Sequence, residues 1–575
     1  MQLRVSSIIR VIWCCMAVLA LHLPSAKAWE FAHGDRDNTG FANVATSPAG
    51  KGSVSVPGLG TFAPGAGPVV ANDGTVYLGT TEGKLIALHA DGSLFWTRDL
   101  SPRQQIVTSP AIAEDGSIFV VGVRKVRKYG TDAPEDMTFA ATLYRFNNTG
   151  ALLSQTAFPK RDNFGPAAFG FPNVWRSGNA EAVMVPVYHR HPIGLTTRLI
   201  AFSLTGSVLD DKVVGSTAPD TIQGAGPDTA VLTCLIPIYN VVADKCGYNP
   251  TRVPNFLVHI PPVPGVGIFT QAGGGTPFIL VSDHYKTLVG YTFSNQRLTE
   301  VLRVHEKDFF MRTPPMPMPD SHTLIGLESI SRDDGIEKAN GRGRIIFAGP
   351  NASKIGPVAL DTTVQAGATR MADGRIALVD GYGNVVILKD GKLFSSMEGA
   401  GRSMASAAAS LSHIFVSGEN GFVTFDANTL AEVSRFNWVG GGLNPPVIGP
   451  KGHVYAIASN ILFVFPPKLT ASTIRQPQSG LAIAPTAEAT NLQEKEYKPP
   501  MTAGGNRLFA CEELDQDDCG KGDHKDISLA WCQKQGYLKA KDFDVDSKKV
   551  TAETLDGRFC SKNKCKVFDQ IVCAN

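Results

Sequence analysis

Residues 67–96 read GPVVANDGTVYLGTTEGKLIALHADGSLFW, and this stretch decides the fold. Short apolar runs alternate in it with three turn dipeptides, Asp73-Gly74, Glu82-Gly83 and Asp91-Gly92. Such a dipeptide between runs of β-branched and aromatic residues favours a tight turn between two strands, because glycine adopts positive φ without steric cost. The stretch therefore predicts four short antiparallel strands.

Similar units recur along the chain, about 40 residues apart where the pattern is clearest, which is the length of one propeller blade. A single four-stranded sheet cannot bury both of its faces, whereas radial stacking covers them and leaves only short edges. We therefore expect an all-β protein with a β-propeller of eight blades; a β-sandwich array is the alternative. The eight copies begin near Gly67, Ser109, Ala182, Pro277, His322, Ala372, Ser412 and Lys451.

The composition agrees with a turn-rich β protein. Of 575 residues, 43% are hydrophobic and 18% charged, with 58 glycines and 37 prolines. This mixture can bury a large core but has little helix-favouring character. The formal net charge of +2 gives no bulk attraction to nucleic acid or to an anionic membrane. Any partner must therefore be recognised through local features.

The first 28 residues have the features of an export signal. Arg4 and Arg10 precede an apolar run over residues 11–23, and Ala26-Lys27-Ala28 supplies small residues at the cleavage positions. An apolar run of about 13 residues is shorter than the roughly 20 that a membrane-spanning helix needs. We expect cleavage before Trp29 and a periplasmic or secreted mature chain without a transmembrane segment.

Cysteines outside this signal number eight, which is an even number and predicts disulfide bonds in an exported chain. Cys234 and Cys246 lie in an insertion between the third and fourth repeats. A bridge there would contribute on the order of 3 kcal/mol in the chain-entropy model; a metal or redox pair is the alternative. The other six are Cys511, Cys519, Cys532, Cys560, Cys565 and Cys573.

Those six cysteines define a small C-terminal module over residues 507–575. It follows the propeller, residues 29–466, and a linker rich in Pro, Ala and Thr, residues 467–506. So small a unit has a meagre apolar core, and three disulfides are the usual remedy, with the pairing left open. We also expect a short helix over Ser528–Gln535 and a final strand over Cys565–Cys573.

One acidic motif in the module has the spacing of a calcium loop. Asp542, Asp544, Asp546 and Glu553 match ligand positions 1, 3, 5 and 12 of an EF-hand, whose carboxylates surround a hard cation. Ser547 stands where that loop has glycine. The aspartates also alternate with Phe543 and Val545, which equally predicts a strand with one solvent-exposed face.

A second motif with metal-binding spacing lies in the third repeat. His189 and His191 are two residues apart, so on a strand they would share one face and could hold a metal ion together. No third ligand is visible nearby in the sequence. Two solvated imidazoles in a loop at a blade edge are the simpler interpretation.

The repeat resembles that of the quinoprotein alcohol dehydrogenase-like propellers, built from PQQ-type repeats. In Gly74–Trp96, Ala87-Leu88-His89, Gly92 and Trp96 follow the family pattern, with His89 where the family usually has Asp. Trp29–Phe41, WEFAHGDRDNTGF, resembles the lead-in segment before the first blade of such proteins. The resemblance covers residues 29–465, and it implies that Trp96 packs between neighbouring blades.

The same resemblance implies one of two functions. Some members are periplasmic dehydrogenases of alcohols or sugars that hold pyrroloquinoline quinone and calcium, and others are scaffolds, as in the outer-membrane barrel-assembly machinery. Quinone-using members carry an adjacent cysteine pair, but the one Cys-Cys in this sequence, Cys14-Cys15, lies in the export signal. We find no matching set of Glu, Asn and Asp for the calcium ion.

We therefore expect a non-catalytic scaffold that binds a protein or a glycan through loops on one rim of the propeller. Two long insertions, Val123–Thr138 and Ser216–Asn255, are the expected contact regions, because rigid scaffolds concentrate recognition on loops. The first insertion contains Lys125, Arg127 and Lys128 and is expected to protrude as a loop. The alternative function is a quinone- and calcium-dependent dehydrogenase.

Overall fold

A computed structural model divides the chain into two compact units, which are described separately. The first comprises Met1–Val54, Gly60–Ser459 and Phe463–Lys468, and the second comprises Ser55–Leu59, Asn460–Leu462 and Leu469–Asn575. The structure describes residues 29–50, 52–101, 104–127, 137–159, 166–191, 194–217, 265–269, 277–283, 286–311, 313–318, 322–333, 336–348, 354–360, 364, 366–467, 494–502, 506–510, 524, 527–528, 531–532, 539–548, 552–553, 559–560 and 565–574.

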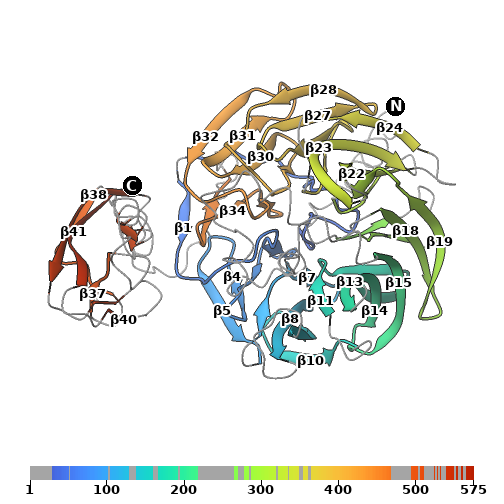
Figure 1. Ribbon diagram of the computed structural model, residues 1–575, viewed down its shortest axis with the longest axis horizontal. Coiled ribbons are helices and arrows are strands. Elements are labelled where there is room, and N and C mark those ends of the chain that lie inside the picture. Colours follow the sequence, from blue (N-terminus) through green and yellow to red (C-terminus); the bar gives the residue numbers. More distant parts are fainter. Residues whose placement is uncertain are drawn as a thin grey trace, which may run out of the picture. The chain divides into compact units, whose positions relative to one another are not determined.

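Within these residues, eight antiparallel sheets succeed one another around a ring (Figure 1). This confirms the all-β propeller, and each sheet coincides with one of the eight predicted repeats. The first four blades are built from β2 (Val69–Val70), β3 (Val76–Gly79), β4 (Lys84–Leu88) and β5 (Leu94–Asp99); β6 (Gln105–Ile106), β7 (Ala111–Ile112), β8 (Ile118–Arg127), β9 (Met137–Phe146) and β10 (Leu152–Ala157); β11 (Pro166–Phe169), β12 (Asn173–Ser177), β13 (Ala180–His191), β14 (Gly194–Ser203) and β15 (Val208–Thr217); and β16 (Val266–Phe269), β17 (Phe278–Ser282), β18 (Thr287–Ser294) and β19 (Arg297–His305).

The remaining blades repeat this plan, except that the eighth takes its outer strand, β1, from the beginning of the chain. Their strands are β20 (Phe309–Met311), β21 (Met316–Pro317), β22 (Thr323–Asp333), β23 (Ile336–Ala348) and β24 (Lys354–Ala359); β25 (Thr369–Arg370), β26 (Ile376–Val379), β27 (Val385–Lys389) and β28 (Lys392–Met397); β29 (Ala408–Ala409), β30 (His413–Gly418), β31 (Gly421–Asp426) and β32 (Glu432–Asn437); and β33 (Val447–Ile448), β34 (Val454–Ala458), β35 (Ile461–Phe465) and β1 (Val54–Val56).

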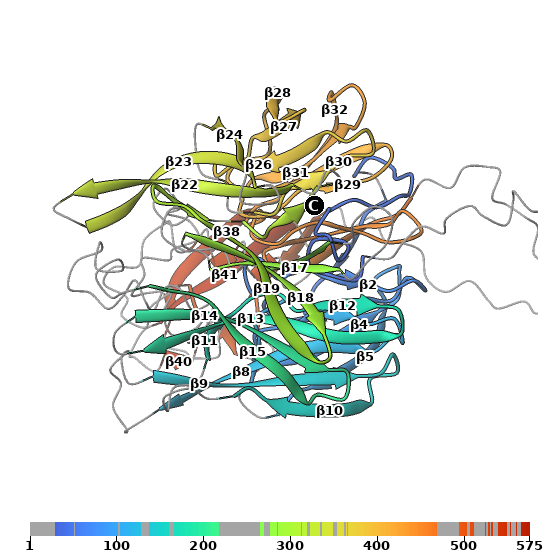
Figure 2. The same ribbon diagram turned by 90° about the vertical axis from the view of Figure 1, so that its right-hand side faces the viewer.

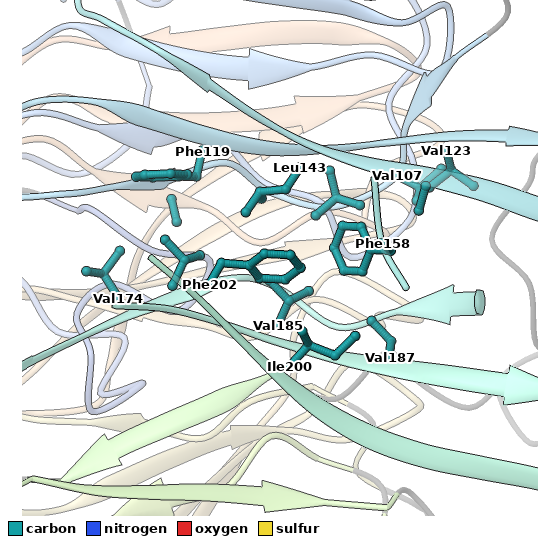
Figure 3. Close-up of a cluster of buried hydrophobic side chains, with 14 of the residues drawn as sticks. Val107, Phe119, Val123, Leu143, Phe158, Val174, Val185, Val187, Ile200 and Phe202 are labelled. Carbon is teal, nitrogen blue, oxygen red and sulfur yellow. The ribbon is translucent and has the colours of Figure 1, made fainter. Parts of the chain in front are cut away.

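Apolar side chains fill the space between adjacent blades. Between blades 2 and 3, Leu143 and Phe158 on one side meet Val185 and Phe202 on the other, and all four are buried (Figure 3). The rings of Phe158 and Phe202 pack edge to face with centroids 4.9 Å apart. Full burial of such a side chain stabilises a fold by about 1.5–3 kcal/mol. Stacking of the blades therefore contributes to the stability of the propeller.

A glycine in a turn of blade 6 allows the connection from blade 6 to blade 7 to pass close to that turn. Gly383 lies in the turn between β26 and β27, and a Cβ atom on it would be 1.7 Å from the carbonyl oxygen of Gly401. Gly401 belongs to the connection from blade 6 to blade 7, where Arg402 and Ala400 accept hydrogen bonds from Glu419 and Asn420. This connection therefore joins the two blades through backbone contacts.

The second unit contains two small sheets. One has the order β36-β41-β38 and the other β37-β39-β40. Two disulfides, Cys532–Cys573 and Cys560–Cys565, link residues of this unit. Its strands are β36 (Glu494–Tyr497), β37 (Arg507–Leu508), β38 (Lys539–Lys548), β39 (Ala552–Glu553), β40 (Phe559–Cys560) and β41 (Cys565–Ala574).

Strand β41 confirms the predicted final strand, and disulfide bonding of the module is also confirmed for four of its six cysteines. Ser528 and Cys532 are helical, whereas the rest of the predicted helix is only partly described. Cys511 and Cys519, like Cys234 and Cys246, lie outside the described residues. In the described part of the chain, no helix is long and apolar enough to cross a membrane.

Candidate functional site

Residues 29–46, which precede the outer strand β1, run across the middle of the ring (Figure 1). We name residues 29–46 the axial segment. The innermost strand of each blade has backbone groups that no neighbouring strand of its own sheet can pair, and buried groups of this kind need a partner. Carbonyl oxygens of the axial segment accept the N–H of Val70 (2.7 Å), Ile112 (3.0 Å), Ile268 (2.8 Å), Arg370 (2.7 Å) and Ala409 (2.8 Å), which lie in blades 1, 2, 4, 6 and 7.

Side-chain amides extend these contacts to two further blades. Asn38 donates from Nδ2 to the carbonyl oxygen of Pro315, beside β21 of blade 5, at 3.1 Å. Asn173 of blade 3 donates from Nδ2 to the carbonyl oxygens of Arg36 and Val266, at 3.0 and 2.7 Å. The axial segment thereby contacts seven of the eight blades.

His33 occupies the middle of the ring together with Phe171, which precedes β12. Both side chains are buried, and their rings are perpendicular with centroids 5.6 Å apart. His33 Nδ1 lies 3.3 Å from Ser406 Oγ, and a Cβ atom on Gly367 would be 2.8 Å from the same nitrogen. Burial lowers the pKa of His33 to about 4, so the imidazole is neutral at neutral pH.

The described residues offer no group of carboxylates for the calcium ion that accompanies a bound quinone. The middle of the ring holds the two packed rings of His33 and Phe171. Across the described residues, no three His, Cys, Asp or Glu side chains gather in a group that could hold a metal ion. Hard cations such as calcium need several oxygen ligands, among which carboxylates are common.

Three blades rise above the rest on one side of the propeller. Strands β8, β13 and β22 have 10, 12 and 11 residues, against 4 in β3, 5 in β17 and 4 in β26. Each pairs along its length with the next strand, so that the hairpins of blades 2, 3 and 5 extend the sheets. Figure 2 shows the hairpin β22–β23 projecting from the propeller.

An additional inner strand supports each of these hairpins. Gln105 on β6 pairs with Val123, Pro166 on β11 pairs with His189, and Phe309 on β20 pairs with Ser329. Because successive strands of a blade run in opposite directions, the second-to-third turn lies on the same side of the ring in every blade. The three hairpins therefore stand on one rim.

This corrects the expected shape of the insertion Val123–Thr138. Its two ends are not a loop: the ladder between β8 and β9 continues to the pair Arg127↔Met137. Val123, Val126 and Thr138 supply β-favouring residues between the cations, which explains the continuation. Residues 128–136 lie outside the described residues, and of the insertion Ser216–Asn255 only the first two residues are described, at the end of β15.

Trp96 lies at the contact between blades 1 and 2. Its Nε1 donates to the carbonyl oxygen of Asn148 in blade 2 at 2.9 Å, and its ring lies 5.8 Å from that of Tyr77. Only 8% of the residue is exposed. The position is one of packing between sheets, away from the axis.

The residues of the acidic motif are divided between the two small sheets of the module. Asp542, Asp544 and Asp546 are exposed on strand β38, whereas Glu553 lies in the other small sheet and accepts hydrogen bonds from Thr502 Oγ1 (2.5 Å) and Asn506 Nδ2 (3.0 Å). Phe543 and Val545 face the core between the aspartates. The alternation therefore describes a strand with one exposed face.

His189 and His191 lie near the end of β13, paired with Thr196 and Gly194 of β14. They occupy a hairpin strand of blade 3 and not a loop. For the axial segment, the sequence predicts only a lead-in to the first blade and not its contacts with the other blades. Its glycines and asparagine provide a local indication of its path, because Gly34, Asn38 and Gly40 all have positive φ.

One family model and several solved structures are similar to this chain. Residues 18–155 match the family model described as outer membrane protein assembly factor BamB. No protein with a curated description matches the chain. Among solved structures, BamB from Moraxella catarrhalis is similar at 12% identity, over 73% of this chain and 100% of that one, with a TM-score of 0.35.

Quinohemoprotein alcohol dehydrogenases are also among the similar structures. The enzyme from Comamonas testosteroni has 10% identity over 80% of this chain and 83% of that one, with a TM-score of 0.39. Enzyme ADHIIG from Pseudomonas putida has 9% identity over 83% of each chain and a TM-score of 0.40. From its repeats, its eight sheets and the family match over its first blades, the chain is a β-propeller of the PQQ-like repeat.

Proposed function

We propose that this protein is an exported, non-catalytic scaffold that binds a protein partner through the three extended hairpins on one rim. The observation that carries the proposal is the set of long, paired hairpins on blades 2, 3 and 5. A hairpin held by a continuous ladder is already ordered before binding, so little conformational entropy is lost on association.

Two further observations support a binding role over a catalytic one. His33 of the axial segment packs against Phe171 at the axis, and the described residues contain no group of three His, Cys, Asp or Glu side chains that could hold a calcium ion. The matching family model is described as an assembly factor. We extend that protein-binding role to this chain and prefer a protein over a glycan as the partner.

The proposal is tested first by titrating the purified protein with pyrroloquinoline quinone and calcium. Tryptophan fluorescence reports binding, and dye reduction with a panel of alcohols and sugars reports turnover. We expect neither saturable binding nor turnover. Turnover with the quinone would overturn the proposal in favour of a dehydrogenase.

Site-specific crosslinking then tests the hairpins. A photoreactive amino acid replaces Lys125 in blade 2 or Arg332 in blade 5, and Phe394, which is 54% exposed on the outer strand β28, serves as the control position. We expect a discrete protein adduct in cells from the two hairpins and none from the control. Adducts at Phe394 alone would refute the assignment of the hairpins.

A further inference from the structure

An exposed tyrosine stands on the rim that carries the three extended hairpins. Tyr382 lies in the turn between β26 and β27, which is the second-to-third turn of blade 6 and therefore belongs to that rim. It is 62% exposed, more than any other large hydrophobic residue that the structure describes. Within the described part of the chain, its side chain makes no hydrogen bond or ring contact. Packing therefore does not explain its place.

The turn itself does not require a tyrosine. Blade 1 has the equivalent turn at residues 80–83, which is closed by the same two backbone hydrogen bonds and ends on a glycine of similar φ, +82° against +84°. Glu82 stands there in the position of Tyr382. Its carboxylate accepts hydrogen bonds from the N–H of Thr61, so it belongs to the local structure. Tyr382 has no such role, and its exposed ring is available for a partner.

The turn holds Tyr382 in a fixed position. The carboxylate of Asp380 accepts hydrogen bonds from the N–H of Tyr382 at 3.0 Å and from the N–H of Asn384 at 2.8 Å. Asp380 is buried, and the next residue of the turn, Gly383, packs against the carbonyl oxygen of Gly401. An aromatic side chain on such a turn loses little conformational entropy when a partner covers it.

Apolar side chains continue from Tyr382 towards blade 8. The connection from blade 6 to blade 7 passes beside the turn, and the carbonyl oxygen of Arg402 in it lies 2.6 Å from the Cβ position of Gly442. Gly442 belongs to the next connection, from blade 7 to blade 8, where Val439 is 55% exposed. Both connections follow a fourth strand and so lie on the same rim. The low arc comprises Tyr382, Arg402, Met404, Val439 and Leu443.

The composition of the low arc is typical of the centre of a protein interface, where tyrosine, methionine and arginine are enriched. Glu398 and Glu419 border Arg402, so the arc has no marked excess of one charge. A glycan site would place several polar side chains beside the aromatic ring, whereas the neighbours of Tyr382 along the arc are mainly apolar. These features favour an apolar patch on a protein as the occupant.

The exposed side chains of the low arc are too few for a stable interface by themselves. A specific protein interface buries about 800 Å² on each partner. The hairpins of blades 2, 3 and 5 stand on the same rim and add further surface. We infer that the partner of the proposed function places an apolar patch on the low arc while it contacts the hairpins. This inference rests on the proposed function and names the chemistry of the partner surface.

The test uses the full-length protein and takes the photocrosslink from Arg332 in blade 5 as its readout. The arc variant carries Tyr382→Ala and Val439→Ser. The matched control carries Phe394→Ala and Val433→Ser, which change residues that are 54% and 44% exposed on the outer strands β28 and β32 of blades 6 and 7. A third variant carries Tyr382→Phe alone. Urea unfolding of each variant verifies that it is folded.

We expect the arc variant to lower the yield of the Arg332 adduct by about ten-fold or more, because both exposed apolar side chains are removed. The control and Tyr382→Phe should stay within about two-fold of the wild type, because an apolar patch contacts the ring and not the hydroxyl group. An unchanged yield in the arc variant, or an equal loss in the arc variant and the control, overturns the inference. A ten-fold loss in Tyr382→Phe overturns the apolar character of the patch.

A photoreactive residue in place of Val439 then tests whether the arc and the hairpins share one partner. Mass spectrometry should find the same protein in this adduct as in the Arg332 adduct. A different protein, or an adduct that carries only a glycan, overturns the inference.

Failure of this inference is distinguishable from failure of the proposed function. If Lys125 and Arg332 give protein adducts that the arc variant does not change, the scaffold role stands and the low arc lies outside its docking surface. The absence of adducts from every rim position, or turnover with the quinone, would remove the scaffold role and the inference together.

Discussion

Gly383 offers a direct test of how the blades are joined. It has φ of +84°, and a Cβ atom there would lie 1.7 Å from the carbonyl oxygen of Gly401. Gly374, in the turn before β26, has the same φ of +84° but no atom within 4 Å of the corresponding position. The two glycines therefore share the backbone conformation and differ only in the close approach.

The expected magnitudes follow from these two terms. An alanine at positive φ lowers the free energy of unfolding by about 1–2 kcal/mol, and this strain applies to both variants. At Gly383 the connection to blade 7 must also move, which disturbs the hydrogen bonds from Glu419 to Arg402 (2.9 Å) and from Asn420 to Ala400 (2.8 Å). Each such bond contributes about 1 kcal/mol. We expect Gly383→Ala to lower the free energy of unfolding by roughly 3–4 kcal/mol and Gly374→Ala by 1–2 kcal/mol.

Urea unfolding followed by tryptophan fluorescence measures both variants against the wild type. The two variants should differ in their destabilisation by about 2 kcal/mol, and this difference measures the effect of the close approach alone, because the backbone strain is the same in both. If Gly383→Ala and Gly374→Ala destabilise the protein equally, the close approach of Gly383 to the connection between blades 6 and 7 does not contribute to the free energy of unfolding. A change in the denaturant slope for Gly383→Ala alone would indicate local opening of the ring.

Three further predictions follow from the described contacts. The pKa of His33 in the folded protein, about 4, lies below its ordinary value of 6.5, so the unfolded chain binds a proton first as pH falls. The free energy of unfolding should therefore decrease by up to about 3 kcal/mol between pH 6.5 and pH 4, as measured by urea unfolding. The variant His33→Leu should lose this pH dependence. Trp96→Phe should destabilise the propeller by about 1 kcal/mol, because the hydrogen bond to the carbonyl oxygen of Asn148 is lost. Trp96→Ala should destabilise it by about 3–5 kcal/mol, because the packing of the ring is lost as well. Similar unfolding curves for the two variants would contradict the packing role. Peptide mapping of the unreduced mature protein should recover the linked pairs Cys532–Cys573 and Cys560–Cys565 and an N-terminus at Trp29; free thiols at the four cysteines would contradict the disulfides.

The blades were predictable because their determinants are local. In Gly67–Trp96, a turn glycine, a β-branched run and a second turn lie within a few residues of each other, and each fixes the strand next to it. The same local reasoning predicts a strand with one exposed face for the aspartates of β38, with a calcium loop as the alternative. It misplaced the ends of the insertion Val123–Thr138, because charge was taken as a sign of a loop.

The site at the axis could not be predicted in the same way. His33 meets Ser406 across 373 positions of sequence, and Asn38 meets Pro315 across 277. Such partners depend on how many blades the ring contains and on which residues precede each inner strand. A single repeat carries no information about either, so the path of the axial segment becomes visible only in the closed ring.

The position of β1 and of the axial segment has a consequence for the kinetics of folding. The first described residues have partners far along the sequence: Phe41 bridges to Ala409, and β1 joins the sheet of β33–β35. Contacts so distant in sequence slow folding, because a long loop must close before any of them is gained. Ring closure therefore requires almost the whole propeller to be present. Moving residues 29–56 to follow Phe465 in a rearranged chain would shorten these two loops, and such a protein should refold faster than the natural chain.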